Sequence, residues 1–228
     1  MNSSTLQKIL FIDIETVPQA KDWNDLDERT QILWDKKTMH QRQELSAEKF
    51  YAHHAGILAE FGKIICISCG LVRQGEIRVK SFYGHHEEKI LQDFCQLLHE
   101  NYSKSDHLLC AHNGKEFDFP YIARRLIIHQ IPIPKLLQIQ GKKPWEITLL
   151  DTLDLWKFGD YKHYTSLDLL AHILGIESPK DDIDGSQVAQ IYYEEKNLDR
   201  IKNYCEKDVI TLINVFLRMN HLPIIHKM

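Results

Sequence analysis

The segment 8–14, Lys-Ile-Leu-Phe-Ile-Asp-Ile, limits the fold of this chain more than any other feature. Successive residues of a strand point to opposite faces, and in this segment both faces are apolar. Such a strand belongs in the middle of a sheet that is covered on both sides. The segment therefore predicts a central, buried strand that ends at two acidic residues.

The rest of the chain predicts an α/β fold, in which a mixed sheet is flanked by helices. Alternating apolar residues predict strands, and apolar residues at helical spacing predict helices. Turn residues separate these segments, and no internal repeat divides the chain, so we expect a single domain over residues 1–228. The predicted strands are 63–72, 77–83, 107–111 and 147–151, and the predicted helices are 87–100, 119–129, 165–175, 186–195 and 197–219.

Residues 19–60 form a segment of different character. It is rich in charge and poor in glycine and proline, and its apolar residues recur loosely at helical spacing. A loop of this length without secondary structure is uncommon. We expect a helical insertion of one or two helices, whose role the sequence leaves open.

Composition restricts the class of protein. The 228 residues include 43% hydrophobic and 26% charged residues, which is typical of a globular chain. A net charge of −4 argues against coating nucleic acid or an anionic membrane by bulk charge, although it allows a small basic channel. The polar start has no apolar run long enough for a signal peptide or a membrane span. With five cysteines, an odd number, these features predict a cytoplasmic protein without membrane association.

Two weaker signals have structural interpretations. Cys66 and Cys69 invite a zinc or redox interpretation, but this kind of zinc site needs a second pair, and buried thiols inside a strand explain them better. Scattered cations are interpreted as solvated side chains, although they could line a phosphate track: Lys115, Arg124, Arg125, Lys142, Lys143 and Lys157.

Asp13 and Glu15 leave the same face of the first strand, because they are two residues apart. Acidic side chains at a core position are costly unless they are paired or bind a metal. The alternative is that the strand has ended and both carboxylates are solvated. The clean strand pattern before them weakens that alternative.

Three further polar residues stand at expected element boundaries or on a helix face. Asp118 begins a predicted helix, where aspartate is a favoured N-cap. Tyr204 and Asp208 are four residues apart on the last predicted helix and share one of its faces. Each of these residues taken alone favours a structural role.

Taken together, the four carboxylates indicate a metal site. An acid pair on a central strand, one acid at a strand–helix junction and one on a late helix can converge at one edge of a sheet. Clustered carboxylates repel one another unless divalent cations neutralise them, and oxygen ligands select Mg²⁺ or Mn²⁺. Two such ions about 3.5–4 Å apart are an arrangement that cleaves phosphodiester bonds.

These residues carry a resemblance to the DEDD 3′–5′ exonucleases. Residues 11–16 (FIDIET) resemble the first exonuclease motif, and residues 113–122 (NGKEFDFPYI) resemble the second in the form found in proofreading domains of family-B DNA polymerases. Residues 204–208 (YCEKD) resemble the third motif of the tyrosine subclass. The sister subclass has a histidine five residues before the aspartate, where this chain has Asn203.

The resemblance implies a ribonuclease-H-like fold and a stand-alone metal-dependent 3′–5′ exonuclease that uses two ions, Mg²⁺ or Mn²⁺. It implies that Asp13 bridges both ions and that Glu15 and Asp208 complete the site of the ion that activates water. Asp118 would hold the second ion, directly or through water, and the Tyr204 hydroxyl would orient the attacking water.

The resemblance also implies contacts and a substrate. Thr16, Asn113 and Phe117 are the expected contacts to the terminal nucleotide. The expected substrate is the 3′ end of nucleic acid, with single-stranded DNA favoured and nucleoside 5′-monophosphates as products. An exonuclease with a strong RNA preference is the nearest alternative, and contacts to the 2′-hydroxyl would distinguish it. A non-catalytic nucleic-acid-binding module is a more distant one, disfavoured because all four acids and the tyrosine are present.

Overall fold

The computed structural model describes residues 3–160, 164–177 and 183–226, and within them a five-stranded sheet forms the centre of the molecule. The strand order is β3-β2-β1-β4-β5. The first three strands in this order pair antiparallel, and β4 and β5 join parallel to β1. The mixed sheet is therefore confirmed, with the first strand in the middle. The strand bounds are β1 Ile9–Pro18, β2 Gly62–Arg73, β3 Glu76–Tyr83, β4 Leu108–Ala111 and β5 Leu150–Asp151.

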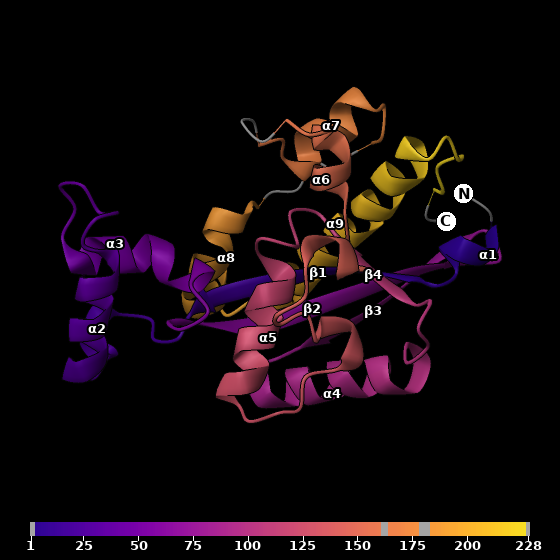
Figure 1. Ribbon diagram of the computed structural model, residues 1–228. Helices are drawn as coiled ribbons and strands as arrows, with labels where there is room; N and C mark the ends of the chain where they lie inside the picture. The colour runs from indigo at the N-terminus through magenta and orange to yellow at the C-terminus, as the bar shows by residue number, and fades with distance from the viewer. Residues whose placement is uncertain (1–2, 161–163, 178–182, 227–228) are drawn as a thin grey trace.

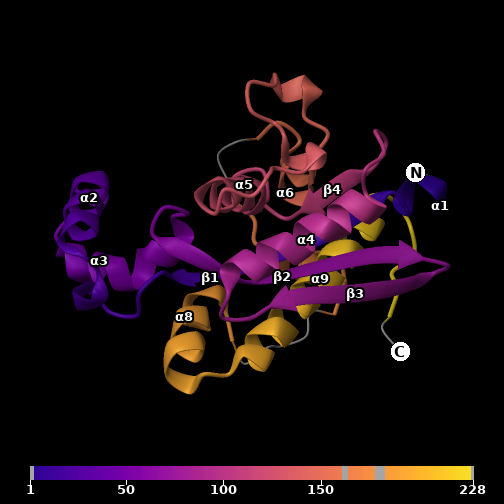
Figure 2. The same ribbon diagram turned by 90° about the horizontal axis from the view of Figure 1, so that it is seen from below.

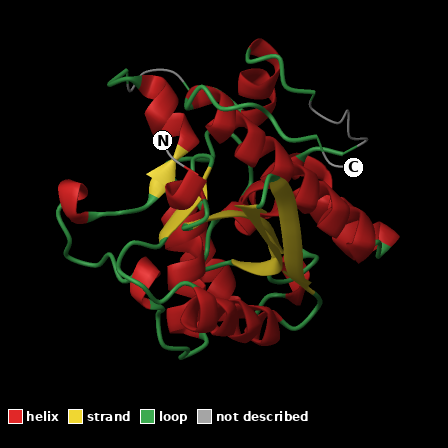
Figure 3. Cartoon of the chain, turned by 90° about the vertical axis from the view of Figure 1, so that its right-hand side faces the viewer, coloured by secondary structure: helices red, strands yellow, loops and turns green. Residues whose placement is uncertain are grey.

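Helices cover both faces of the sheet, as Figures 1 and 3 show. Even-numbered residues of β1 pack in one core cluster with α4 (Glu87–Asn101) and α5 (Asp118–Ile128). Odd-numbered residues Ile9 and Phe11 pack in another cluster with α9 (Leu198–Met219). The two apolar faces of the first strand thus each have a helical layer. Because Asp13 and Glu15 are also odd-numbered, their side chains leave β1 on the side of α9.

A glycine allows α9 to lie close to the sheet. A Cβ atom on Gly70 of β2 would lie 2.4 Å from Val209 Cγ1 and 2.8 Å from Ile213 Cδ1. Such distances are shorter than van der Waals contact, so any larger residue at this position would require the Val209 and Ile213 side chains to shift. The close approach holds the polar end of α9 over the acidic part of β1.

Several elements differ from the sequence-based prediction. β1 continues to Pro18, so Asp13 and Glu15 lie inside the strand rather than at its end. β5 has only two residues, because it pairs only with the last two residues of the short strand β4. The helix α6 (Thr152–Lys157) was not predicted. The predicted helix 186–195 is three short pieces: a 3₁₀ turn Gly185–Gln187, α8 (Val188–Gln190) and a π-helical turn Ile191–Glu195.

The segment 19–60 folds as a helical unit at the end of β1 and β2, apart from the main layers (Figures 1 and 2). It contains α2 (Glu28–Thr38) and α3 (Ala47–His54), with 3₁₀ turns Trp23–Asp25 and Ala55–Ile57. Asp27 and Ser46 cap the two helices, since each side chain accepts a hydrogen bond from a backbone N–H three residues ahead. A small core surrounds the fully buried Trp34.

Two short helices complete the described chain, α1 (Ser3–Leu6) and α7 (Leu167–Ile173), with further 3₁₀ turns at Lys135–Leu137 and Pro144–Glu146. Among the described residues, no helix is both long enough and apolar enough to span a bilayer.

Candidate active site

Asp13 and Glu15 form the base of the site on β1. Glu15 is 7% exposed, and Asp13 is half-buried beneath α9. The Cys205 thiol of α9 donates a hydrogen bond to Asp13 Oδ2 at 3.2 Å. One carboxylate oxygen from each acid and the Cys205 sulfur all lie within 4.8 Å of one another. The β-strand spacing therefore brings two carboxylates together at one point of the sheet.

Asp118 joins them from the start of α5. Its side chain is 4% exposed, and the backbone N–H of Ile14 donates to its carboxylate, which ties α5 to β1. The turn before α5 is tight: a Cβ atom on Gly114 would lie 2.3 Å from Ala111 Cβ. Asn113 also adopts a left-handed conformation, with φ of 58°. The N-cap residue of α5 is Phe117, so the Asp118 carboxylate does not cap the helix and is directed into the site.

Tyr204 and Asp208 complete the group from α9. The Tyr204 hydroxyl hydrogen-bonds the Asp208 carboxylate, as their spacing on one helix face allows. Burial, followed by the negative charges of Asp208 and Glu15, raises the pKa of Tyr204 well above its usual value. The hydroxyl therefore remains protonated across the physiological pH range.

The electrostatics of the cluster suit a divalent cation. Burial, followed by the charge of Asp208, raises the pKa of Asp13, and burial with the charge of Asp13 raises the pKa of Glu15. Burial raises the pKa of Asp118 to about 7. Carboxylates held together in this way favour a cation that neutralises them, and an all-oxygen set of this kind fits hard divalent ions.

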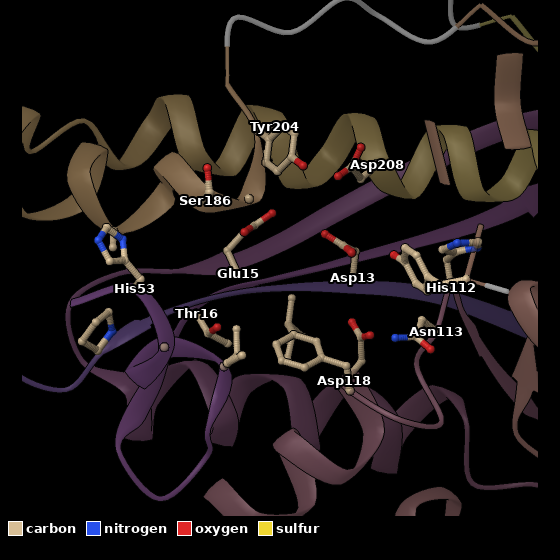
Figure 4. A pocket seen from close by; sticks show the side chains of 18 of the residues that line it. Asp13, Glu15, Thr16, His53, His112, Asn113, Asp118, Ser186, Tyr204 and Asp208 are labelled. Carbon is tan, nitrogen blue, oxygen red and sulfur yellow. The ribbon is translucent and has the colours of Figure 1, made fainter. Parts of the chain in front are cut away.

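A pocket of about 550 Å³ lies over these residues. Figure 4 shows Asp13 and Glu15 in its middle, with Tyr204 and Asp208 on one side and Asp118 on the other. Thr16, Asn113 and Phe117, the predicted nucleotide contacts, all line the same pocket. Thr16 also hydrogen-bonds the Tyr121 hydroxyl of α5. The structure thus brings every sequence-predicted site residue to one cavity.

The pocket lining includes residues that were not predicted from the sequence, among them His53, Ile57, Tyr164 and Ser186. None of these four residues was assigned a role from the sequence. They come from segments outside the three motifs. No spacing pattern in the sequence relates these segments to the acids, because their proximity depends on how the insertion and the 3₁₀ turn Gly185–Gln187 pack.

Asp151 holds the loop that precedes Asp118. Its buried carboxylate accepts hydrogen bonds at 2.9 Å from the backbone N–H groups of Asn113, Lys115 and Leu153. It therefore caps α6 and also fixes the Asn113 turn. His112 is half-buried at the pocket wall, with Thr152 Oγ1 and the Thr165 carbonyl each 2.9 Å from a ring nitrogen. Both of its ring nitrogens are therefore occupied within the fold.

Not all of the cations that were expected to be solvated side chains are exposed to solvent. Arg125 is buried, and its Nε donates at 2.8 Å to Glu87 Oε1 while its Nη1 donates at 2.9 Å to the Ala59 carbonyl. The interpretation of Arg125 as a solvated or phosphate-tracking cation is therefore wrong, since it joins α4, α5 and the end of the insertion. Lys115 pairs with Asp154 at 3.0 Å at the surface.

Comparison with known proteins places the chain in a family. Residues 57–224, well over half of the chain, match the family described as "Predicted 3'-5' exonuclease related to the exonuclease domain of PolB". The chain belongs to this family. The matched region of this PolB-exonuclease-related protein contains Asp118, Tyr204 and Asp208, whereas Asp13 and Glu15 precede it.

A solved polymerase structure supports the fold. The family B DNA polymerase from the hyperthermophilic archaeon Pyrobaculum calidifontis superposes with a TM-score of 0.60 at 12% identity, over 92% of this chain and 24% of the polymerase. The chain thus spans about a quarter of the length of that polymerase, and the ribonuclease-H-like fold is confirmed. The RNase domain of the yeast Pop2 protein matches at 12% identity with a TM-score of 0.46, over 95% of this chain and 78% of that domain. A search of curated proteins found no match.

Proposed function

We propose that this chain is a cytoplasmic, metal-dependent 3′–5′ exonuclease that releases nucleoside 5′-monophosphates from single-stranded DNA. One observation supports the proposal most directly: four carboxylates from three distant segments meet Tyr204 in a single pocket. The family supports a 3′–5′ exonuclease activity. All five cysteines are free thiols, which accords with a reducing compartment.

In this proposal Asp13, Glu15, Asp118 and Asp208 hold two divalent ions, Mg²⁺ or Mn²⁺. Such ions, when bound, lower the pKa of a coordinated water and neutralise charge on the scissile phosphate and the leaving oxygen. The Tyr204 hydroxyl, which stays protonated, orients the attacking water toward the phosphorus. The buried Cys205 thiol keeps the Asp13 carboxylate in its orientation.

The remaining pocket residues bind and place the strand end. Thr16, Asn113 and Phe117, which were expected to contact the terminal nucleotide, contact the two nucleotides at the strand end, and Thr16 contacts the terminal one. The pocket volume of about 550 Å³ is in the range of sites for one small ligand, which suits an unpaired strand end rather than a duplex.

An end-labelled ladder tests the activity and its polarity. A 5′-labelled DNA strand incubated with the protein and Mn²⁺ is expected to shorten one nucleotide at a time, and a blocked 3′ end is expected to protect it. Parallel reactions use duplex DNA and RNA of the same sequence. Release of the label as a mononucleotide in the first turnover would show cleavage from the 5′ end. Faster shortening of RNA than of DNA would show that the enzyme prefers RNA.

Tyr204→Phe is expected to lower the rate of cleavage while leaving measurable activity. Removing the hydroxyl removes only the group that orients water, and loss of such a group typically costs ~10²–10⁴-fold. Single-turnover rates across pH provide the measurement, and a thermal melt confirms that the variant folds. Parent-like rates at every pH would show that Tyr204 is a packing residue.

Asp151→Asn is expected to slow cleavage on the order of 10–100-fold, the effect typical of residues that orient metal ligands. The substituted amide turns a donor toward the Lys115 N–H, which leaves one partly buried hydrogen bond unmade and costs about 1 kcal/mol of stability. Asp154→Asn is the matched control, because Asp154 follows on the same helix and pairs with the Lys115 side chain instead. Equal cleavage rates for the two variants would show that Asp151 does not position Asn113 for cleavage.

A further inference from the structure

The insertion is anchored to the active-site end of the sheet. The Tyr121 hydroxyl of α5 donates to the Gly56 carbonyl at 2.8 Å and hydrogen-bonds Thr16 of β1. The Tyr51 hydroxyl is 3.2 Å from both the backbone nitrogen and the carbonyl oxygen of Ala20. A Cβ atom on Gly56 would lie 3.3 Å from Val17 and Pro18, so the backbone here lies directly against β1. The turn Ala55–Ile57 is therefore held in place beside Thr16.

Within this anchored turn, Ile57 stands out by its exposure. Its neighbours Ala55 and Ala59 are 0% and 1% exposed, whereas Ile57 is 55% exposed. Its side chain lines the active-site pocket, as does His53 one turn earlier on α3. An apolar side chain that a rigid backbone presents to a binding pocket is available to pack against a ligand.

The acids divide the pocket into two parts, which Figure 4 shows on either side of Glu15 and Asp13. Thr16, His53 and Ser186 lie at one end, and His112 and Asn113 lie at the other. Ile57 belongs to the first part, because it follows Gly56, which the Tyr121 hydroxyl links to Thr16. A phosphodiester bond cleaved at the acids has a nucleotide on each side, so both parts of the pocket must receive one.

The part beside Thr16 suits the last nucleotide of a strand. It lies between the insertion, represented by His53, and the turn Gly185–Gln187, represented by Ser186 (Figure 4). The opposite part contains His112, with the Tyr164 ring beside it, whereas Thr16, the contact to the terminal nucleotide in the proposed function, lies in the first part. We propose that the Ile57 side chain packs against the base of the 3′-terminal nucleotide. The insertion 19–60 is then part of the substrate site, an inference that rests on the proposed function.

Binding of abasic strands tests this contact. The Kd of a 5′-fluorescein single strand is measured by fluorescence anisotropy in Ca²⁺, with strand integrity checked on a gel, for the parent and for Ile57→Ala. With a normal strand the variant is expected to bind about tenfold more weakly, a loss of about 1.4 kcal/mol, because the substitution removes most of the apolar side chain that packs against the base. With an abasic 3′-terminal residue the parent and variant are expected to bind equally. With an abasic penultimate residue the full difference is expected to remain.

Leu33→Ala is the matched control, because Leu33 is an exposed apolar residue of α2 in the same insertion and does not line the pocket. It is expected to bind all three strands as the parent does, and thermal melts establish that both variants fold. Equal Kd values for the parent and Ile57→Ala on the normal strand would overturn the inference. A difference that disappears only with the abasic penultimate residue would overturn it as well.

The same experiment separates this inference from the proposed function. If the parent shortens no strand in Mg²⁺ or Mn²⁺ but the abasic pattern holds, the exonuclease activity fails and the base contact stands. If the parent shortens strands and Ile57→Ala binds them normally, the base contact fails and the activity stands.

Discussion

Asp208→Ala is expected to reduce cleavage of single-stranded DNA on the order of 10⁴-fold, the loss typical of a residue that acts as part of one catalytic unit. The substitution removes one of the carboxylates that surround the pocket and the hydrogen-bond partner of Tyr204. Single-turnover cleavage of a 5′-labelled strand in saturating Mn²⁺ gives the comparison.

The stability of the same variant distinguishes a lost ligand from a lost fold. Burial, followed by the charge of Asp208, raises the pKa of Asp13, and an acid whose pKa is raised by folding destabilises the folded state once the pH exceeds its unfolded pKa. Near pH 7, and without metal, Asp208→Ala should therefore melt no lower than the parent. An active Asp208→Ala protein would show that the third motif is a chance match.

Removal of divalent ions is expected to abolish cleavage completely, and Mn²⁺ or Mg²⁺ added in excess of the chelator should restore it. The physical reason is the repulsion within the acidic cluster, where burial and neighbouring carboxylates raise the pKa values of Asp13 and Glu15. Titration with EDTA, followed by each metal in turn, measures the dependence.

Thermal melting provides a readout of the metal that does not depend on activity. An ion that binds only the folded protein stabilises it by about 2.7 kcal/mol at a hundred times its Kd. Mn²⁺ should therefore raise the melting temperature of the parent and of Glu100→Gln, a control at an exposed acid of α4, but raise that of Asp13→Asn much less. Full cleavage activity in EDTA would rule out the two-ion mechanism.

The sequence by itself determined the centre of the fold. The apolar residues on both faces of β1 require a covering layer on each side, and the structure supplies α4 and α5 on one face and α9 on the other. The apolar residues at helical spacing over 197–219 likewise predicted how α9 packs, because a helix with one apolar face must bury that face. The placement of Tyr204 and Asp208 on one helix face also follows from local spacing.

Only the tertiary structure decided what surrounds the acids. Ile57 lines the pocket because the hydrogen bond from Tyr121 to Gly56 holds its turn beside β1. Arg125 is buried because it donates a hydrogen bond to Glu87 on another helix. Periodicity and capping report on neighbours within a few residues along the chain. Contacts between distant segments depend instead on how whole elements pack. The sequence therefore predicted the acidic cluster and the nearby residues Thr16, Asn113 and Phe117, whereas the rest of the pocket wall followed only from the packed fold.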